Sequence, residues 1–142
     1  MNPYTTFPVK IVDVKCGQFV QVSVPKFGEV PISISDYDRD VMELTIREVG
    51  HVTNAIFNKG IGDYLHIRGP YGNGFDVKDH YGKDLIIVTG GTGLAPVKYI
   101  INYFSDNIDK LNSFKLISGF KSSQEILFRD SFDKWKENID VC

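Results

Sequence analysis

The sequence has few cysteines, little net charge and no long apolar run, and each absence excludes a class of protein. Its 142 residues include only two cysteines, Cys16 and Cys142, which lie far apart. An iron–sulfur cluster or a thiolate zinc site needs clustered cysteines, and the three histidines form no zinc-binding pattern. A formal net charge of −2 provides no basic footprint for nucleic acid. We therefore expect no metal site and no nucleic-acid partner.

The sequence also lacks a membrane span and a secretory signal. No stretch approaches the roughly 18 consecutive apolar residues of a transmembrane helix. The N-terminal stretch MNPYTTFPVK has neither the charged start nor the apolar centre of a signal peptide. Isolated thiols suit a reducing compartment, so the predicted location is cytoplasmic. What is present is a hydrophobic fraction of 42%, which is enough to form a folded core.

The stretch KDLIIVTGGTGLAPVKYIINYF, residues 83–104, carries the clearest local pattern. Residues 85–88 are a short apolar run without alternation, which predicts a strand covered on both faces. A turn with three glycines follows, and then the apolar residues of 97–104 fall on one stripe of a predicted helix. Pro96 lies in the first turn of this helix, where a missing N–H costs little.

This order of strand, glycine-rich turn and helix is a candidate phosphate site. Free N–H groups at a helix start and the positive end of the helix dipole attract an anion, and glycines let a diphosphate approach the backbone. The spacing departs from G-x-G-x-x-G, because Pro96 occupies the place of the third glycine. A plain tight turn that binds nothing is the alternative interpretation of this stretch.

Up to about residue 80 the pattern predicts only short strands and one helical turn. Gly60 closes that helical turn, Thr53 is its predicted N-cap, and a stiff glycine-rich loop covers residues 69–75. Together these features predict a small antiparallel β-barrel. The predicted strands are residues 8–14, 18–24, 30–35, 41–49 and 64–68.

From residue 83 onward the pattern changes to strand, helix, strand and helix. A second apolar strand is predicted at residues 114–118 and a second helix at residues 123–136. Such alternation is typical of a parallel sheet. The predicted fold class is therefore a β-barrel followed by an α/β domain, with residues 1–80 forming the barrel and residues 83–142 a partial nucleotide-binding domain.

Four motifs in a fixed order carry a family resemblance: VPISIS, EVGHVTNAI, GDYLHIRGPYGNGF and LIIVTGGTGLAP. In this order they resemble the ferredoxin–NADP reductase superfamily of flavoprotein reductases. Within it, the chain is most similar to the electron-transfer subunits of anaerobic sulfite reductase, of sulfhydrogenase (its gamma chain) and of dihydroorotate dehydrogenase B. The resemblance covers nearly the whole chain, roughly residues 8–132.

This resemblance implies an NAD(P)H-dependent flavoprotein oxidoreductase subunit. FAD is expected in the barrel and NAD(P)H on the following sheet. Electrons would pass from the nucleotide through FAD to an iron–sulfur partner subunit. No catalytic acid or base is required, because the cofactors carry the chemistry. The alternative is a truncated, non-catalytic module that docks a partner and binds no flavin.

The resemblance also assigns residues to the two cofactors. For the flavin ring and the strand beside it, it implies Pro31, Ile32, Ser33, Thr45, Ile46 and Arg47. For the flavin diphosphate it implies Gly50, Val52 and Thr53. For the nicotinamide nucleotide it implies Gly90, Gly91, Thr92, Gly93 and Pro96. Read alone, each set has a simpler explanation as an ordinary strand, helix start or turn.

Several departures from the family pattern matter. Val30 stands where the family has an arginine, so Arg47 is the candidate cation for a diphosphate. Only residues 15–17 separate the first two predicted strands, so the barrel is expected to be short by a strand. The sheet has two predicted parallel strands and lacks the family's cysteine cluster, which suggests truncation. Lys121 and the two serines after it could accept a 2′-phosphate or form a solvated loop, so NAD and NADP both stay open.

Overall fold

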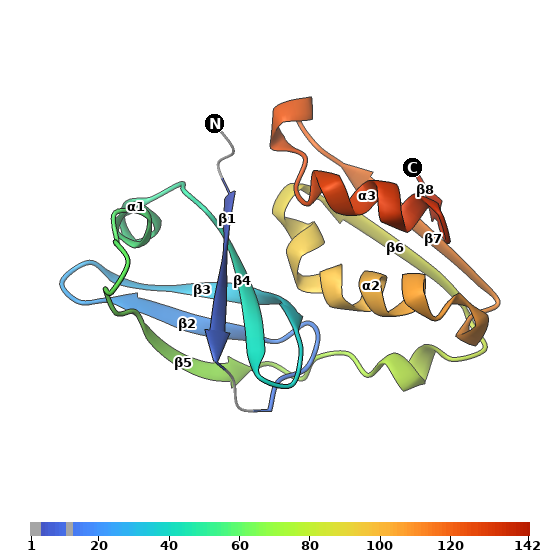
Figure 1. Cartoon of the computed structure of the whole chain (residues 1–142), viewed down its shortest axis with the longest axis horizontal. Coiled ribbons are helices and arrows are strands. Elements are labelled where there is room, and N and C mark those ends of the chain that lie inside the picture. The colour runs from blue at the N-terminus through green and yellow to red at the C-terminus, as the bar shows by residue number, and fades with distance from the viewer. Residues whose placement is uncertain (1–3, 11–12) are drawn as a thin grey trace.

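The computed structural model describes residues 4–10 and 13–142, and it contains two sheets that lie next to each other (Figure 1). The N-terminal sheet has five antiparallel strands, and the C-terminal sheet has three parallel strands. We call the two parts the antiparallel lobe and the parallel lobe. The predicted order of an antiparallel barrel-type sheet followed by an α/β unit is therefore confirmed.

The strands of the antiparallel lobe pair in the order β1-β4-β3-β2-β5. In Figure 1, β1 and β4 run across the direction of β2, β3 and β5, so the sheet curls around its own core. Among the described residues β1 and β5 are the edges, and no closed barrel forms. Five strands agree with the predicted shortage of one. Their bounds are Tyr4–Lys10 (β1), Phe19–Val24 (β2), Gly28–Tyr37 (β3), Val41–Arg47 (β4) and His66–Tyr71 (β5).

The core of this lobe follows the alternation of the sequence. Every second residue of β2 and β4 is buried, because successive side chains of a strand point to opposite faces. Helix α1 (His51–Phe57) covers one end of the sheet with Ala55 and Ile56. The buried strand residues are Val20, Val22, Val24, Ile32, Ile34, Met42, Leu44 and Ile46.

Several predicted element bounds in this lobe were wrong, including both ends of the third strand, which spans Gly28–Tyr37 and not residues 30–35. The first strand ends at Lys10, and Asp13 and Val14 of the predicted span are not in a strand, while residues 11–12 lie outside the described residues. The fourth strand ends at Arg47 and not at residue 49. The fifth strand extends to Tyr71, because Phe19 of β2 still pairs with Tyr71. Register with a neighbouring strand therefore carries β5 into a segment whose local sequence is typical of a loop.

The parallel lobe pairs its strands in the order β6-β7-β8. They are Asp84–Gly90 (β6), Ser113–Gly119 (β7) and Asp140–Val141 (β8). Helices α2 (Lys98–Asp106) and α3 (Arg129–Lys136) lie together on one face of this sheet (Figure 1). Short 3-10 helices connect these elements at Val77–His80, Gly91–Val97, Ile108–Lys110 and Ser123–Glu125. The core between sheet and helices includes Leu94, Ile101, Phe104, Leu116 and Trp135.

The prediction that β6 is covered on both faces was wrong. Its burial alternates, and the side chains of Ile86 and Val88 are 63% and 71% exposed. Ile117 of β7, which is in register with Val88, is also exposed. The apolar run of residues 85–88 is typical of a strand covered on both faces. Within the described chain, however, α2 and α3 both pack on the same face of the parallel sheet. The other face of the parallel sheet is therefore an exposed apolar strip.

Both predicted helices of this lobe begin later than expected. Residues 91–97 form a 3-10 helix that contains Pro96, and α2 starts only at Lys98. The last predicted helix is divided, because Phe128 has a positive φ of 55° and separates a 3-10 turn from α3. We call Gly91–Val97 the glycine turn. This turn packs against β3 of the antiparallel lobe.

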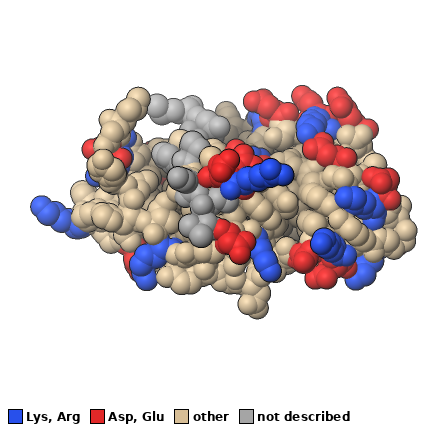
Figure 2. All heavy atoms as spheres, turned by 60° about the horizontal axis from the view of Figure 1, so that its bottom comes forward, with Lys and Arg blue, Asp and Glu red and all other residues tan. Residues whose placement is uncertain are grey.

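Two surface properties bear on possible partners. On the face shown in Figure 2, acidic and basic side chains lie interspersed over the molecule. Within residues 4–10 and 13–142, no helix is both long and apolar enough to cross a membrane.

Candidate functional site

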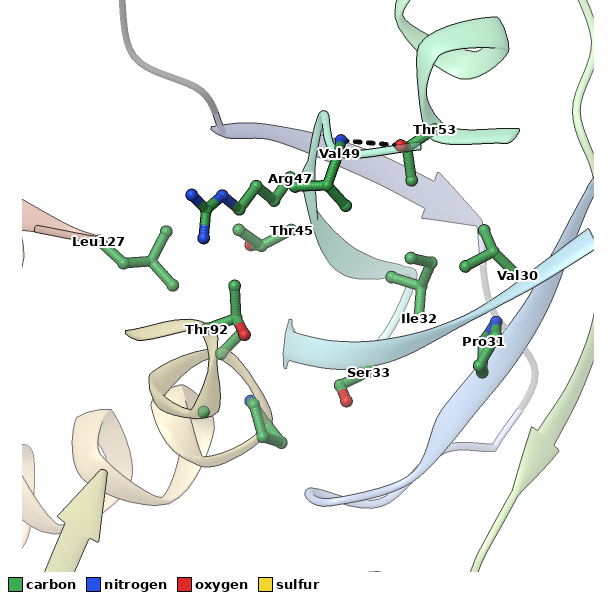
Figure 3. A pocket seen from close by; sticks show the side chains of 13 residues that line it. Val30, Pro31, Ile32, Ser33, Thr45, Arg47, Val49, Thr53, Thr92 and Leu127 are labelled. Carbon is green, nitrogen blue, oxygen red and sulfur yellow. Dashed lines mark hydrogen bonds between the residues drawn. The ribbon is translucent and has the colours of Figure 1, made fainter. Parts of the chain in front are cut away.

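A pocket of about 360 Å³ lies where the two lobes meet. Figure 3 shows that its walls come from β3 and β4 on one side and from the glycine turn on the other, with Leu127 of the segment before α3 closing one end. Elements more than forty residues apart in the chain thus share one cavity. The lining residues are Val30, Pro31, Ile32, Ser33, Thr45, Arg47, Val49, Thr53, Thr92, Gly93, Ala95, Pro96 and Leu127.

The strands β3 and β4 form the wall on the antiparallel side. Thr45 and Arg47 line the pocket, whereas the side chain of Ile46 between them is 1% exposed and points into the lobe's core. This follows from the two-residue period of a strand. The Thr45 hydroxyl forms a 2.9 Å hydrogen bond with the Ser35 hydroxyl, which links the two strands beside the pocket.

The turn between β4 and α1 forms the upper end of the pocket in Figure 3. The prediction of Thr53 as N-cap was wrong, because α1 begins at His51 and Gly50 is its N-cap. Thr53 lies one turn inside. Its hydroxyl accepts hydrogen bonds from the N–H groups of Val49 (3.0 Å) and Gly50 (2.9 Å), and donates to the Gly50 carbonyl (3.0 Å). One buried hydroxyl therefore fixes the shape of this turn.

Replacing Thr53 with valine is expected to lower the free energy of unfolding by about 2–3 kcal/mol, because the shape is kept but two N–H groups lose their acceptor. Urea unfolding of wild type and variant measures this difference. Thr53→Ser is the matched control, since it keeps the hydroxyl and is expected to stay within about 1 kcal/mol of wild type. Equal stability of the valine variant and wild type would show that the hydroxyl does not hold the turn.

The glycine turn forms the opposite wall. A side-chain carbon placed on Gly90, Gly91 or Gly93 meets nothing within 4 Å, so there is open space in front of all three. Gly91 has a φ of +52°, which L-residues rarely adopt. Its backbone conformation therefore also favours glycine at this position. The three glycines thus leave room for a group to approach the backbone, as a cradle for a diphosphate requires.

A buried thiol supports the glycine turn from behind. The Sγ of Cys16 donates a 3.5 Å hydrogen bond to the carbonyl of Pro96, and the Cys16 N–H donates to the Tyr37 hydroxyl. Burial raises the pKa of this thiol to about 11, so it stays neutral near pH 7. Cys16 is therefore a structural contact between the lobes.

Arg47 supplies a positive charge in the pocket. Its guanidinium lies 3.5 Å from the carboxylate of Glu125 and is about one-third exposed. In Figure 3 the side chain extends from β4 toward Leu127, across the opening between the lobes. Because a partly exposed pair at this distance is weak, an anionic ligand could compete with Glu125 for the guanidinium.

Most of the predicted site residues come together in this pocket. Gly50 and Val52 flank the Thr53 turn, and Gly90 and Gly91 precede Thr92, without lining the cavity. The predicted residues that line it are Pro31, Ile32, Ser33, Thr45, Arg47, Thr53, Thr92, Gly93 and Pro96. Sequence reasoning missed Val49, Ala95 and Leu127: the first two lie inside quoted motifs but were given no role, and Leu127 belongs to none of the motifs.

The fold and the site define a class of protein. Residues 87–141 match the model of the Oxidoreductase NAD-binding domain family. The CS-b5R domains of human Ncb5or superpose with a TM-score of 0.84 at 22% identity, over 98% of this chain and 46% of that one. Ferredoxin-NADP+ reductase from Plasmodium falciparum gives a TM-score of 0.77 at 14% identity, over 98% of this chain and 62% of that one. The chain therefore has the fold of the ferredoxin–NADP reductases, and its residues 87–141 are similar to the Oxidoreductase NAD-binding domain family.

Curated relatives narrow this class. Sulfhydrogenase 2 subunit gamma of Pyrococcus furiosus is 37% identical, over 92% of this chain and 54% of that protein. A probable dihydroorotate dehydrogenase B electron transfer subunit of Thermoplasma acidophilum is 39% identical, over 84% of this chain and 43% of that protein. The chain thus spans about half the length of the curated relatives it matches. Resemblance to the ferredoxin–NADP reductase superfamily and to these two subunit types is confirmed, while likeness to the sulfite reductase subunit stays a prediction.

Proposed function

We propose that this chain is a flavin-dependent electron-transfer subunit of an oxidoreductase, passing electrons between NAD(P)H and an iron–sulfur partner through FAD. One observation carries the proposal: a single pocket is bounded both by β3, β4 and the Thr53 turn, and by the glycine turn of the NAD-binding part. Hydride transfer requires the nicotinamide and flavin rings to touch, and only a shared cavity permits that. The names of the curated relatives, gamma and electron transfer subunits, support the same role.

The residues on the antiparallel side fit a flavin. Pro31 and Ile32 present an apolar wall to a ring, and Ser33 offers a hydroxyl beside it. Thr45, Ile46 and Arg47 form the next strand, whose Arg47 supplies the positive charge that Val30 lacks. Thr53 lines the pocket at the start of α1, and Gly50 and Val52, which flank it outside the lining, would complete the turn that holds the diphosphate. Bound FAD would supply the redox chemistry, and these residues would hold and orient it.

The residues on the parallel side fit a nicotinamide nucleotide. Gly90, Gly91 and Gly93 leave open space at the carboxyl end of β6, where nucleotides bind in open parallel sheets. Thr92 and Pro96 line the pocket opposite Ser33. These residues would bind the diphosphate and bring the nicotinamide ring against the flavin. We propose no acid or base, since the lining contains no histidine, aspartate or glutamate.

The setting of this subunit is also a proposal. Two relatives are named as subunits of sulfhydrogenase and dihydroorotate dehydrogenase B, which supports an electron-accepting partner subunit and favours these types over sulfite reductase. Cys16 and Cys142 are both free thiols, which suits a reducing cytoplasm. We further propose that residues 1–80 form the flavin domain and residues 83–142 part of the nucleotide domain.

Flavin binding tests this proposal. Free FAD at about one hundred times its dissociation constant is expected to stabilise the protein by about 2.7 kcal/mol, because a ligand of the native state alone shifts unfolding. Thermal unfolding with and without FAD measures the shift. Riboflavin, which lacks the diphosphate, is the matched control and is expected to stabilise less. A purified protein without flavin absorption that FAD does not stabilise would support the docking module instead.

A further inference from the structure

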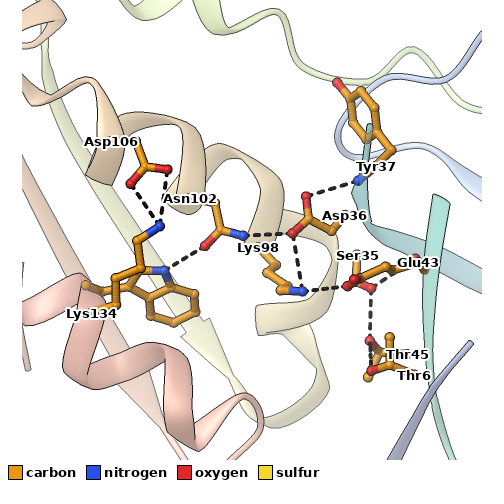
Figure 4. A network of polar contacts seen from close by, with 11 residues as sticks. Thr6, Ser35, Asp36, Tyr37, Glu43, Thr45, Lys98, Asn102, Asp106 and Lys134 are labelled. Atoms are coloured by element: carbon orange, nitrogen blue, oxygen red, sulfur yellow. Dashed lines mark hydrogen bonds and ion pairs between the residues drawn. The ribbon is translucent and has the colours of Figure 1, made fainter. Parts of the chain in front are cut away.

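A largely buried lysine joins the two lobes next to the pocket. Lys98 is the first residue of α2, and its side chain is only 12% exposed. Its Nζ lies 2.6 Å from an oxygen of Glu43 on β4 and 3.2 Å from an oxygen of Asp36 on β3. Figure 4 shows this side chain reaching from the parallel lobe to both strands of the antiparallel lobe. One ammonium group therefore binds two carboxylates of the opposite lobe.

The contact continues into the core of the parallel lobe. Asn102, one turn further along α2, donates a 2.7 Å hydrogen bond to the same oxygen of Asp36. Its own carbonyl accepts a 2.8 Å hydrogen bond from the indole N–H of the fully buried Trp135. Asp36 is thus held by two residues of α2, one of which is anchored to α3 (Figure 4). The junction between the lobes is a defined polar network rather than a loose surface contact.

Each residue that Lys98 contacts is a near neighbour of a pocket wall. Glu43 lies on the same face of β4 as Thr45, and Asp36 follows Ser33 in β3. The ring of Phe128, whose centroid is 4.9 Å from the Lys98 Nζ, adjoins Leu127. Lys98 itself comes directly after the glycine turn. The ammonium group therefore connects β3 and β4 with the start of α2, which directly follows the glycine turn, and it lies against the ring of Phe128 next to Leu127.

A pair of this kind fixes geometry better than an exposed ion pair does. An exposed lysine–carboxylate contact is screened by water and contributes little, whereas a largely buried charge must keep its partners. Tyr37 of β3 also stacks on Tyr99 of α2 with ring centroids 4.1 Å apart, which supports the same alignment. The stack resists separation of the lobes, and the two carboxylates also resist sliding of α2 along the strands.

We propose that Lys98 is a positioning residue that sets the distance between the glycine turn and the strands β3 and β4. It would thereby set the approach of the nicotinamide ring to the flavin without touching either cofactor. This inference rests on the proposed function for its effect on rate. Its structural part, that Lys98 holds the glycine turn against the antiparallel lobe, is independent of any cofactor.

The test compares Lys98→Met with Lys98→Arg and Lys134→Met. Methionine removes the charge at similar volume, and arginine keeps a cation that can reach both carboxylates. Lys134→Met is the matched control, because Lys134 pairs with Asp106 at 2.9 Å within the parallel lobe and does not bridge the lobes. Hydrogen exchange of residues 89–97 reports on the turn without cofactor, and single-turnover flavin reduction by NADPH or NADH reports on ring approach.

We expect Lys98→Met to speed exchange in residues 89–97 and to slow flavin reduction, each at least tenfold, with FAD affinity within threefold of wild type. Lys98→Arg is expected to recover most of both losses, and Lys134→Met to resemble wild type. If Lys98→Met and Lys134→Met behave alike in exchange and rate, the positioning role is wrong. If wild type itself shows no flavin reduction, the proposed function fails, while the exchange result still decides whether Lys98 holds the turn.

Discussion

Replacing Gly93 with valine is expected to weaken binding of NADH and NADPH at least tenfold while leaving the free energy of unfolding within about 0.5 kcal/mol of wild type. Gly93 lines the pocket, and its backbone is not in the left-handed region that favours glycine. An added Cβ meets no protein atom within 4 Å, so we expect the new side chain to fill space that a ligand would otherwise occupy. Calorimetric titration gives the affinity, and urea unfolding gives the stability.

Gly91→Val is the matched control for this experiment. Gly91 precedes the pocket and has a φ of +52°, so a β-branched residue there is strained by about 1–2 kcal/mol. We therefore expect this variant to lose stability, in contrast to Gly93→Val. If Gly93→Val lost stability and affinity in parallel, the open space at the glycine turn would be a folding requirement and not a binding site.

Replacing Trp135 with alanine is expected to lower the free energy of unfolding by about 3–5 kcal/mol, the usual cost of removing a large buried aromatic side chain. Trp135 is fully buried between α3 and α2, and its indole N–H donates to Asn102. Such a loss is a large part of the roughly 5–15 kcal/mol that keeps a typical protein folded. Chemical unfolding of both proteins measures it.

Ile86→Ala is the control for the Trp135 variant. Ile86 is a large apolar residue of the same lobe, but it lies on the uncovered face of the sheet, where little area is removed from water. We expect this change to cost less than about 1 kcal/mol. A cost close to that of the tryptophan variant would mean that the exposed face of β6 and β7 is covered in solution.

The sequence predicted the antiparallel lobe well because its strands have one buried face. Alternation in residues 19–24 and 41–47 correctly predicted which side chains are buried in the core. It also places Thr45 and Arg47 on the opposite face of β4 from Ile46. The glycine turn was predicted because three glycines follow an apolar run and precede an amphipathic helical pattern, although this pattern alone fits a plain tight turn as well as a phosphate site. Local periodicity and turn chemistry therefore predicted the strands and the turn that border the candidate site, and the family resemblance assigned its individual residues.

What the sequence could not provide depends on packing between distant segments. The run at residues 85–88 looks doubly covered, and only the shared position of α2 and α3 shows that one face is open. Thr53 fits an N-cap locally, but its hydroxyl bonds two preceding amides from inside the helix. Leu127 and Lys98 carry no motif, and their places beside the pocket follow from the docking of the two lobes.

The most direct test is to load the purified chain with FAD, exclude oxygen and add NADH or NADPH while recording the visible absorption of the flavin. If one pocket holds both cofactors with their rings in contact, the flavin band bleaches within seconds with at least one of the two nucleotides, and bleaching is slowed in Gly93→Val. FAD that binds tightly and stays oxidised with both nucleotides would contradict the claim that the two lobes form one shared site.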